Sequence, residues 1–113
     1  MSSSRLLIAH VHGLAGRRAE LRALLDELAT AARDEPGCLE FQVLERSDPG
    51  EMVLIAAWNG TEALRAHFAT SHYRRYREAV GALLARPSDV TVHYVSQTVR
   101  AVDPDPPDPA TFD

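Results

Sequence analysis

The segment from Met52 to Trp58, MVLIAAW, constrains the fold of this chain more than any other. It is a nearly unbroken apolar run, preceded by the turn-forming residues Ser47-Asp48-Pro49-Gly50, and its length is typical of a β-strand. Because successive side chains of a strand point to opposite faces of a sheet, an apolar strand of this kind requires cover on both faces. One helical layer in a small domain covers a single face, so the segment predicts a partner subunit on the other.

Two strands and a helix are predicted before this segment. Leu6 to Val11 is a short alternating run, and Cys38 to Glu45 places Leu39, Phe41 and Val43 on one face, so both are typical of strands. Between them, Arg17 to Arg33 has leucines at helical spacing, which indicates an amphipathic helix. Glu35-Pro36-Gly37 ends that helix, since the residue before a proline disfavours helical backbone. Cys38 itself is expected to be a small buried apolar residue.

A broken helix and a last strand are predicted after it. Asn59-Gly60-Thr61 can start one helical segment, and Thr70-Ser71 can cap a second. Helical spacing puts polar aromatic residues on the inner faces of both segments, whereas Arg74, Arg75 and Arg77 are expected on the solvated side. Asp89 to Gln97 alternates as a final strand.

The order strand, helix, strand, strand, broken helix, strand predicts an α+β fold. It is the split βαβ arrangement of ferredoxin-like domains, with a four-stranded antiparallel sheet and helices on one face. Two such sheets packed face to face form a dimeric α+β barrel, which supplies the second cover that Met52 to Trp58 requires. We therefore expect a homodimer through the open sheet face.

Length and composition limit the chain to one small domain. Residues 1–100 are expected to form it, and the acidic, proline-rich residues 101–113 are expected to be disordered. No apolar run approaches the ~20 residues of a membrane span, and no signal-peptide core follows the N-terminus, so cytoplasmic residence without membrane contact is expected. Four aspartates of the tail account for the net charge of −4, which leaves no basic surface that would favour nucleic acid.

The reactive residue types exclude several classes of site. The chain has one cysteine and no lysine, which excludes an internal disulfide, thiolate-rich metal sites, lysine Schiff bases and P-loops. The glycines do not have the spacing of a dinucleotide-binding turn, so no flavin or nicotinamide pattern is present. His10 and His12 share one strand face, and His93 can join them. That spacing suits metal ligands, but no further ligand is fixed by the sequence, so we expect no metal and treat them as polar residues of a sheet or dimer face.

Several short motifs follow one another along the predicted fold: Glu35-Pro36-Gly37-Cys38, Phe41, Trp58, Glu62-Ala63-Leu64, His67 and Ser71-His72-Tyr73. In these motifs the chain resembles the antibiotic biosynthesis monooxygenase superfamily of small dimeric α+β barrel proteins, which includes cofactor-free quinol monooxygenases. The resemblance covers roughly Leu6 to Tyr94. Asn59-Gly60 departs from the acidic residue and capping serine or aspartate that members usually have there. His67 and Arg77 stand where the haem-degrading branch has its tryptophan and histidine, so haem degradation is not expected.

The resemblance implies a cofactor-independent monooxygenase that oxidises a small aromatic quinol or polyketide-like phenol with dioxygen. A deprotonated phenol is itself electron-rich, so the protein need supply only a base, orientation and a dry cavity. Histidine suits the base because its pKa lies near neutrality. We expect His67 to be the base, with His72 second. The expected substrate-binding residues are Trp58, Tyr73, Tyr76, Phe41 and Phe68.

Two other functions fit the same sequence. One is a cofactor-free isomerase that acts on a small oxygenated metabolite. The other is a non-catalytic dimer that binds a small molecule, in which His67 and His72 only pack or anchor their helices. Each expected site residue also has a structural role open to it, since buried aromatic and histidine side chains are common in protein cores.

Overall fold

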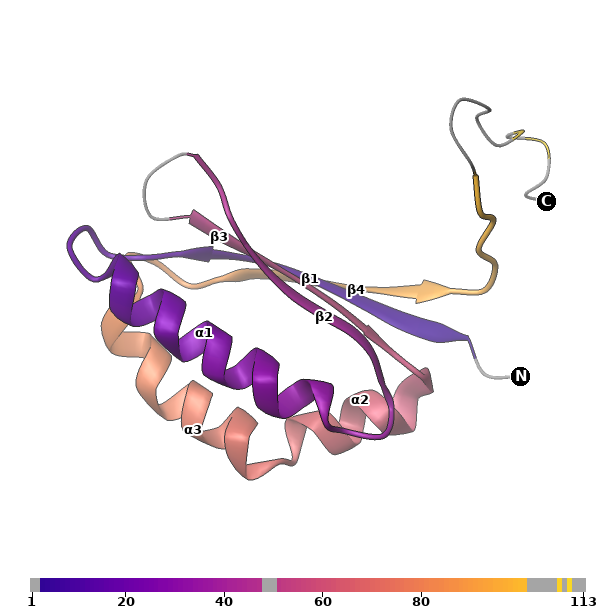
Figure 1. Ribbon diagram of the computed structural model, residues 1–113, viewed down its shortest axis with the longest axis horizontal. Coiled ribbons are helices and arrows are strands. Elements are labelled where there is room, and N and C mark those ends of the chain that lie inside the picture. The colour runs from indigo at the N-terminus through magenta and orange to yellow at the C-terminus, as the bar shows by residue number, and fades with distance from the viewer. Residues whose placement is uncertain (1–2, 48–50, 102–107, 109, 111–113) are drawn as a thin grey trace.

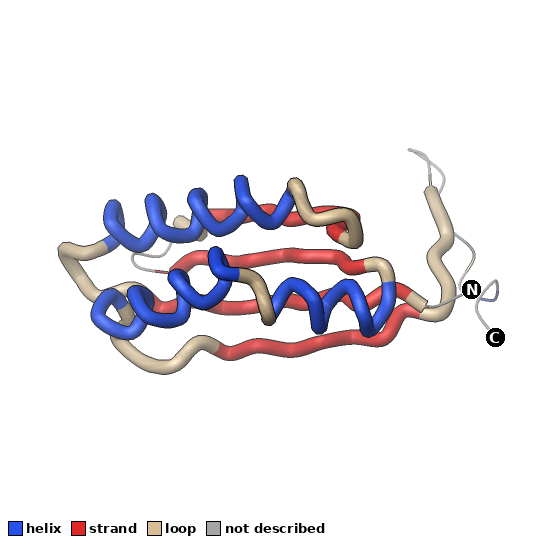
Figure 2. Tube along the Cα trace, turned by 90° about the horizontal axis from the view of Figure 1, so that it is seen from below, coloured by secondary structure: helices blue, strands red, loops and turns tan. Residues whose placement is uncertain are grey.

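The computed structural model describes residues 3–47, 51–101, 108 and 110, and it has the predicted ferredoxin-like α+β fold (Figure 1). The sheet is antiparallel, in the order β2-β3-β1-β4. Its strands are β1 (Ser4–His12), β2 (Cys38–Glu45), β3 (Glu51–Trp58) and β4 (Asp89–Val95). The helices α1 (Arg18–Arg33), α2 (Gly60–Phe68) and α3 (Ser71–Val80), with the short 3-10 helix η1 (Gly81–Leu83), lie on one face (Figure 2).

Strand β3 is an inner strand of the sheet, and its side chains alternate between the two faces. Met52, Leu54, Ala56 and Trp58 are buried under the helices, whereas the residues between them are only partly buried. The strand is therefore apolar on both faces, as predicted, but a single chain covers only one of them. The second face carries apolar side chains that this chain leaves partly in solvent.

Helix α1 covers the sheet with a continuous apolar stripe. Its buried residues are Leu21, Leu25, Leu28, Ala29 and Ala32, which repeat at the predicted helical spacing. Full burial of each leucine contributes roughly 1.5–3 kcal/mol, so this stripe is a main source of attachment between helix and sheet. It covers one part of the sheet face, and α2 with α3 covers the part beside it.

The break between α2 and α3 is fixed by Thr70. Its side-chain oxygen accepts a hydrogen bond from the backbone N–H of Tyr73 at 3.2 Å, which confirms the predicted cap. Asn59 precedes α2 without a side-chain capping bond. Gly60 follows it with φ of 89°, a left-handed conformation that favours glycine, so the backbone enters α2 through this residue.

Gly37 lets the start of β2 lie directly against α2. A Cβ built on Gly37 would meet the Cβ of Ala63 at 2.3 Å, which is closer than real atoms approach. The carbonyl of Gly37 also accepts a hydrogen bond from the backbone N–H of Asn59 at 2.9 Å. Glycine is required here by the close approach of two backbones, and this contact holds the end of the α1–β2 connection against α2.

Three other sequence predictions concern the burial of Cys38, membrane-spanning helices, and the turn and tail of the chain. Cys38 is only partly buried, and burial raises the pKa of its thiol. Within the described part of the chain no helix combines the length and apolarity that crossing a membrane requires. The predicted turn at Asp48-Pro49-Gly50 and nearly all of the acidic tail lie outside the described residues, while cytoplasmic residence stays a prediction.

Candidate active site

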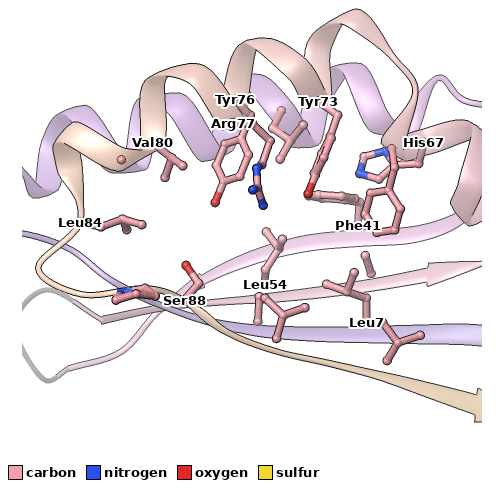
Figure 3. A pocket seen from close by; sticks show the side chains of 18 of the residues that line it. Leu7, Phe41, Leu54, His67, Tyr73, Tyr76, Arg77, Val80, Leu84 and Ser88 are labelled. Atoms are coloured by element: carbon pink, nitrogen blue, oxygen red, sulfur yellow. The ribbon is translucent and has the colours of Figure 1, made fainter.

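A cavity of about 660 Å³ lies between the sheet and the helix α3 (Figure 3). Apolar side chains of β1, β3 and β4, among them Leu7, Leu54 and Val92, line its sheet side. Aromatic residues form one end of it: Phe41, Trp58, His67, Phe68 and Tyr73. Its volume falls within the roughly 300–1,000 Å³ of small-molecule sites. The cavity therefore suits an aromatic ligand.

His67 is the polar residue at the aromatic end. Helix α2 carries it, and its side chain is almost completely buried, with the whole residue 3% exposed. Its ring packs on the indole of Trp58, the last residue of β3, with centroids 4.3 Å apart and planes tilted by 30°. Phe41 also contacts the indole in an edge-to-face arrangement, with ring centroids 6.3 Å apart. These contacts fix the imidazole in one position.

Glu35 forms a hydrogen bond with His67 and does not itself line the cavity. The carboxylate oxygen Oε2 of Glu35 lies 2.8 Å from Nδ1 of His67 and 2.7 Å from Nε2 of His72. Glu35 follows the last turn of α1, where its backbone N–H donates to the carbonyl of Ala32. One carboxylate thus joins the end of α1 to a histidine of α2 and a histidine of α3.

This arrangement assigns the protons of both rings. An ionised carboxylate only accepts hydrogen bonds, so Nδ1 of His67 and Nε2 of His72 carry the hydrogens that point at Glu35. Nε2 of neutral His67 is then the unprotonated nitrogen. No group in the described part of the chain hydrogen-bonds to that atom. The ring therefore has a lone pair available to a ligand.

The surroundings of His67 keep it neutral. Burial lowers the pKa of its imidazole below the ordinary value of 6.5, and the hydrogen bond to Glu35 opposes the shift only in part. A neutral imidazole at pH 7 can accept a proton, which a protonated one cannot. The buried indole N–H of Trp58 has no hydrogen-bond partner among the described residues.

Two tyrosines of α3 point their hydroxyls toward the cavity, as Figure 3 shows. Tyr73 packs against the ring of His67 with centroids 5.2 Å apart, and Tyr76 lies 6.2 Å from Tyr73. Burial raises the pKa of Tyr76 to about 12, so its hydroxyl remains a donor at neutral pH. Phe68 lines the same end but is 43% exposed, which makes it a residue of the rim.

His72 has a different position from the one its predicted role requires. It contacts Glu35 but does not line the cavity, so it lies on the far side of the carboxylate from the ligand space. Direct contact with a substrate is not available to it in this structure. What the structure shows of His72 is its hydrogen bond with Glu35, and its role in catalysis stays a prediction.

The residues available for metal binding differ from those noted in the sequence. Glu35, His67 and His72 bring their ligand atoms within 4.8 Å of one another, a set of two nitrogens and one oxygen that suits divalent metals. Here the three residues are joined by the two hydrogen bonds described above. His10, His12 and His93 instead bond separately to Glu51, Asp89 and Thr91.

A family model described as antibiotic biosynthesis monooxygenase matches residues 5–79, which includes Trp58, His67 and Glu35. The chain belongs to the antibiotic biosynthesis monooxygenase family.

Among the solved structures similar to this monooxygenase-family chain are those of two relatives. The Mycobacterium tuberculosis protein named "Putative monooxygenase Rv0793" is 41% identical over 92 residues, which are 81% of this chain and 91% of that protein. Its structure superposes with a TM-score of 0.82 and 38% identity, and the match covers 87% of this chain and all of the other. PA3566 from Pseudomonas aeruginosa gives a TM-score of 0.77 at 29% identity, covering 83% of this chain and 95% of that one.

Two cavity features of this family member were not predicted from its sequence. Glu35 was interpreted as the end of a helix and as part of a family motif, but not as a site residue, because a contact with His67 across 32 residues has no local signal. Arg77 was predicted on the solvated side of α3, and it is exposed as predicted, but that it also lines the cavity was not foreseen. The spacing held a signal for Arg77: it lies four residues after Tyr73, so both belong to the same helix face.

Proposed function

We propose that this antibiotic biosynthesis monooxygenase family member oxidises a small aromatic quinol or polyketide-like phenol with dioxygen and without an organic cofactor. The observation that carries the proposal is His67: a buried, neutral imidazole with its free nitrogen at the aromatic end of an apolar cavity. A base in that position can act on a phenolic hydroxyl of a ring that packs beside it.

The proposed reaction begins with proton transfer from the substrate hydroxyl to Nε2 of His67. Glu35 stabilises the imidazolium that forms, because its carboxylate is 2.8 Å from Nδ1. The phenolate then gives one electron to dioxygen, and the resulting superoxide combines with the substrate radical to form a peroxide. Loss of water leaves a quinone with one new oxygen. A quinol and dioxygen thus yield a hydroxyquinone and water, so the substrate supplies both electrons for the second oxygen atom.

The other residues of the cavity bind and orient the substrate. Trp58 and Phe41 provide an aromatic floor under His67, and Tyr73 and Phe68 flank it from the helices. Tyr76 offers a hydroxyl that remains protonated and can hold a substrate oxygen. Buried apolar side chains line the part of the cavity near His67, and such low-polarity surroundings strengthen the polar contacts made there.

Oxygen consumption with a panel of hydroquinones tests this function. Wild-type protein should consume one dioxygen per quinol, and labelled dioxygen should place one labelled atom in the product. The variant His67→Ala should be inactive, while His93→Ala, which changes an exposed histidine, should retain activity. Turnover by the wild type no faster than by His67→Ala would contradict the proposal and leave the fold unaffected.

A second candidate is a cofactor-free isomerase. The cavity holds a neutral base, His67, and a protonated acid, Tyr76, which together can move a proton within a substrate. Product formation without oxygen consumption would favour this reaction over the oxidation.

We also propose that a second copy of the chain covers the open face of the sheet. Ile8, Ile55 and Leu44 lie on this face, on three neighbouring strands, and Leu44 is 44% exposed. Packing two such faces together would bury these side chains and form the dimeric α+β barrel.

A further inference from the structure

Three hydrogen-bond donors lie in the part of the cavity away from Trp58. They are the hydroxyl of Tyr76, the guanidinium of Arg77 and the hydroxyl of Ser88, and Figure 3 shows all three directed into the cavity. None of the three side chains has a hydrogen-bond or ion-pair partner in the described part of the chain. Donors that face an apolar space without partners are suited to an acceptor on the ligand.

The charge at this end is positive and is not neutralised by the lining. Arg77 and Arg86 are the charged residues among those that line the cavity, and no described carboxylate lines it. Arg86 is engaged with the ring of His12 at 3.4 Å. Arg75, two residues before Arg77, forms an ion pair with Glu27 instead. Of the two cavity arginines, Arg77 is therefore the one without a side-chain partner among the described residues.

The two ends are separated along α3. Tyr73 contacts His67, and Arg77 follows it by one helical turn, a rise of about 6 Å. That separation is comparable to the length of two fused aromatic rings. A ligand whose ring packs between Phe41 and Tyr73 would therefore present a substituent to Arg77 rather than to the histidine.

We propose that the cavity selects aromatic substrates that carry a carboxylate, which Arg77, Tyr76 and Ser88 bind while the reacting ring lies beside His67. The inference rests on the proposed function for its substrate class. A carboxylate fits better than a phosphate dianion, because a single free guanidinium offers one positive charge with a planar pair of donors. Arg77 would act in recognition and orientation, and His67 in the chemistry.

Calorimetric titration with 2-naphthoate and its uncharged amide, 2-naphthamide, tests this specificity. Neither compound is a quinol, so binding is measured without turnover and does not depend on the oxidation. Wild-type protein should bind the carboxylate about tenfold more tightly than the amide, the effect expected of one partly solvated charge-assisted contact. Arg77→Gln should bind the two compounds equally, and Arg77→Lys should retain part of the preference.

Arg74→Gln is the matched control, since Arg74 is an exposed arginine of the same helix that does not line the cavity. It should keep the full preference for the carboxylate. The proposal is overturned if Arg77→Gln retains the preference, if Arg86→Gln alone abolishes it, or if wild-type protein does not distinguish the two compounds. Oxygen consumption with uncharged quinols, measured in parallel, then shows whether the proposed oxidation stands without the carboxylate contact.

Discussion

The two faces of the sheet both carry histidine–carboxylate pairs, but in different surroundings. On the open face, Nδ1 of His10 lies 3.0 Å from Glu51, and the two side chains are 41% and 23% exposed. On the covered side, Nδ1 of His67 lies 2.8 Å from Glu35, and the side chains are only 4% and 12% exposed. The hydrogen-bond distances are nearly the same, so the two pairs differ mainly in burial and in the second partner of the carboxylate, which is Arg46 for Glu51 and His72 for Glu35.

The pKa shifts found in the two pairs have different causes. In the open pair, the hydrogen bond from His10 lowers the pKa of Glu51, and water screens the interaction. In the covered pair, burial lowers the pKa of His67 in spite of its carboxylate partner. Pairing alone is therefore an ordinary surface feature in this protein. Pairing inside an aromatic cavity produces a neutral base held in one orientation.

The largest difference in activity between the two sites is expected when the histidine of each pair is replaced by glutamine. His67→Gln keeps a group able to bond to Glu35 but removes the base, so kcat/KM should fall by about 100-fold or more. His10→Gln should change kcat/KM by less than about twofold, because exposed pairs contribute little. Steady-state oxygen consumption measures both, with assembly checked by light scattering. Equal losses in the two variants would remove the functional difference between the faces.

Replacing the carboxylate of each pair gives a second comparison of the covered and open faces. Glu35 raises the pKa of His67, so Glu35→Gln should lower that pKa further and move the acidic limb of the kcat/KM profile to lower pH. The plateau should also drop, by about tenfold, because the imidazolium loses its partner. Glu51→Gln is the matched control and should leave the profile in place. An unchanged acidic limb in Glu35→Gln would mean that Glu35 serves only stability.

A smaller effect is expected in the pH dependence of stability. The pKa of His67 is lower in the folded protein than the 6.5 of an unperturbed histidine, so the unfolded chain binds its proton first. The stabilisation present above pH 6.5 is therefore lost as the pH falls toward the folded pKa. Thermal unfolding at pH 7 and pH 5 should show a larger decrease for the wild type than for His67→Gln. The same decrease in both proteins would assign the acid sensitivity to other groups.

Substitutions on the open face of the sheet are expected to change the activity least. Ile55→Glu places a charge among the apolar residues proposed to meet a second copy, so the dimer should give way to monomer in light scattering. Thr30→Glu, which places a charge at an exposed position of helix α1 on the other side of the sheet, should leave the dimer intact. The site lies on the covered side, so a monomeric variant should keep activity within a few fold. A wild-type monomer would contradict the proposed assembly.

The sequence predicted the fold almost completely, because periodicity is a local property. Strand β2 occupies the predicted residues 38–45, and the break before α3 falls at Thr70 as its capping chemistry indicates. The last strand was predicted to reach Gln97 but ends at Val95. Val95 pairs with Ser4, the first residue of β1, so beyond it β1 offers no further partner. Strand ends of this kind depend on the neighbouring strand rather than on local pattern.

The candidate site was predicted only in part, because its geometry depends on contacts between distant residues. His67, Trp58 and Tyr73 follow from aromatic residues on inner faces. Glu35 meets His67 only once α1 and α2 pack, and nothing near Glu35 in the chain indicates that contact. The roles of His72 and Arg77 likewise depend on how α3 is rotated over the cavity.

The geometry of the site depends on the backbone contact between Gly37 and Ala63. Glu35 lies two residues before Gly37, and His67 lies one turn after Ala63 on α2, so the backbone contact sets the spacing of the carboxylate and the imidazole. A single methyl group at position 37 would push α2 outward and lengthen the bond between Glu35 and His67, although it touches neither. The strength of the proposed base is thus controlled by a position that has no side chain.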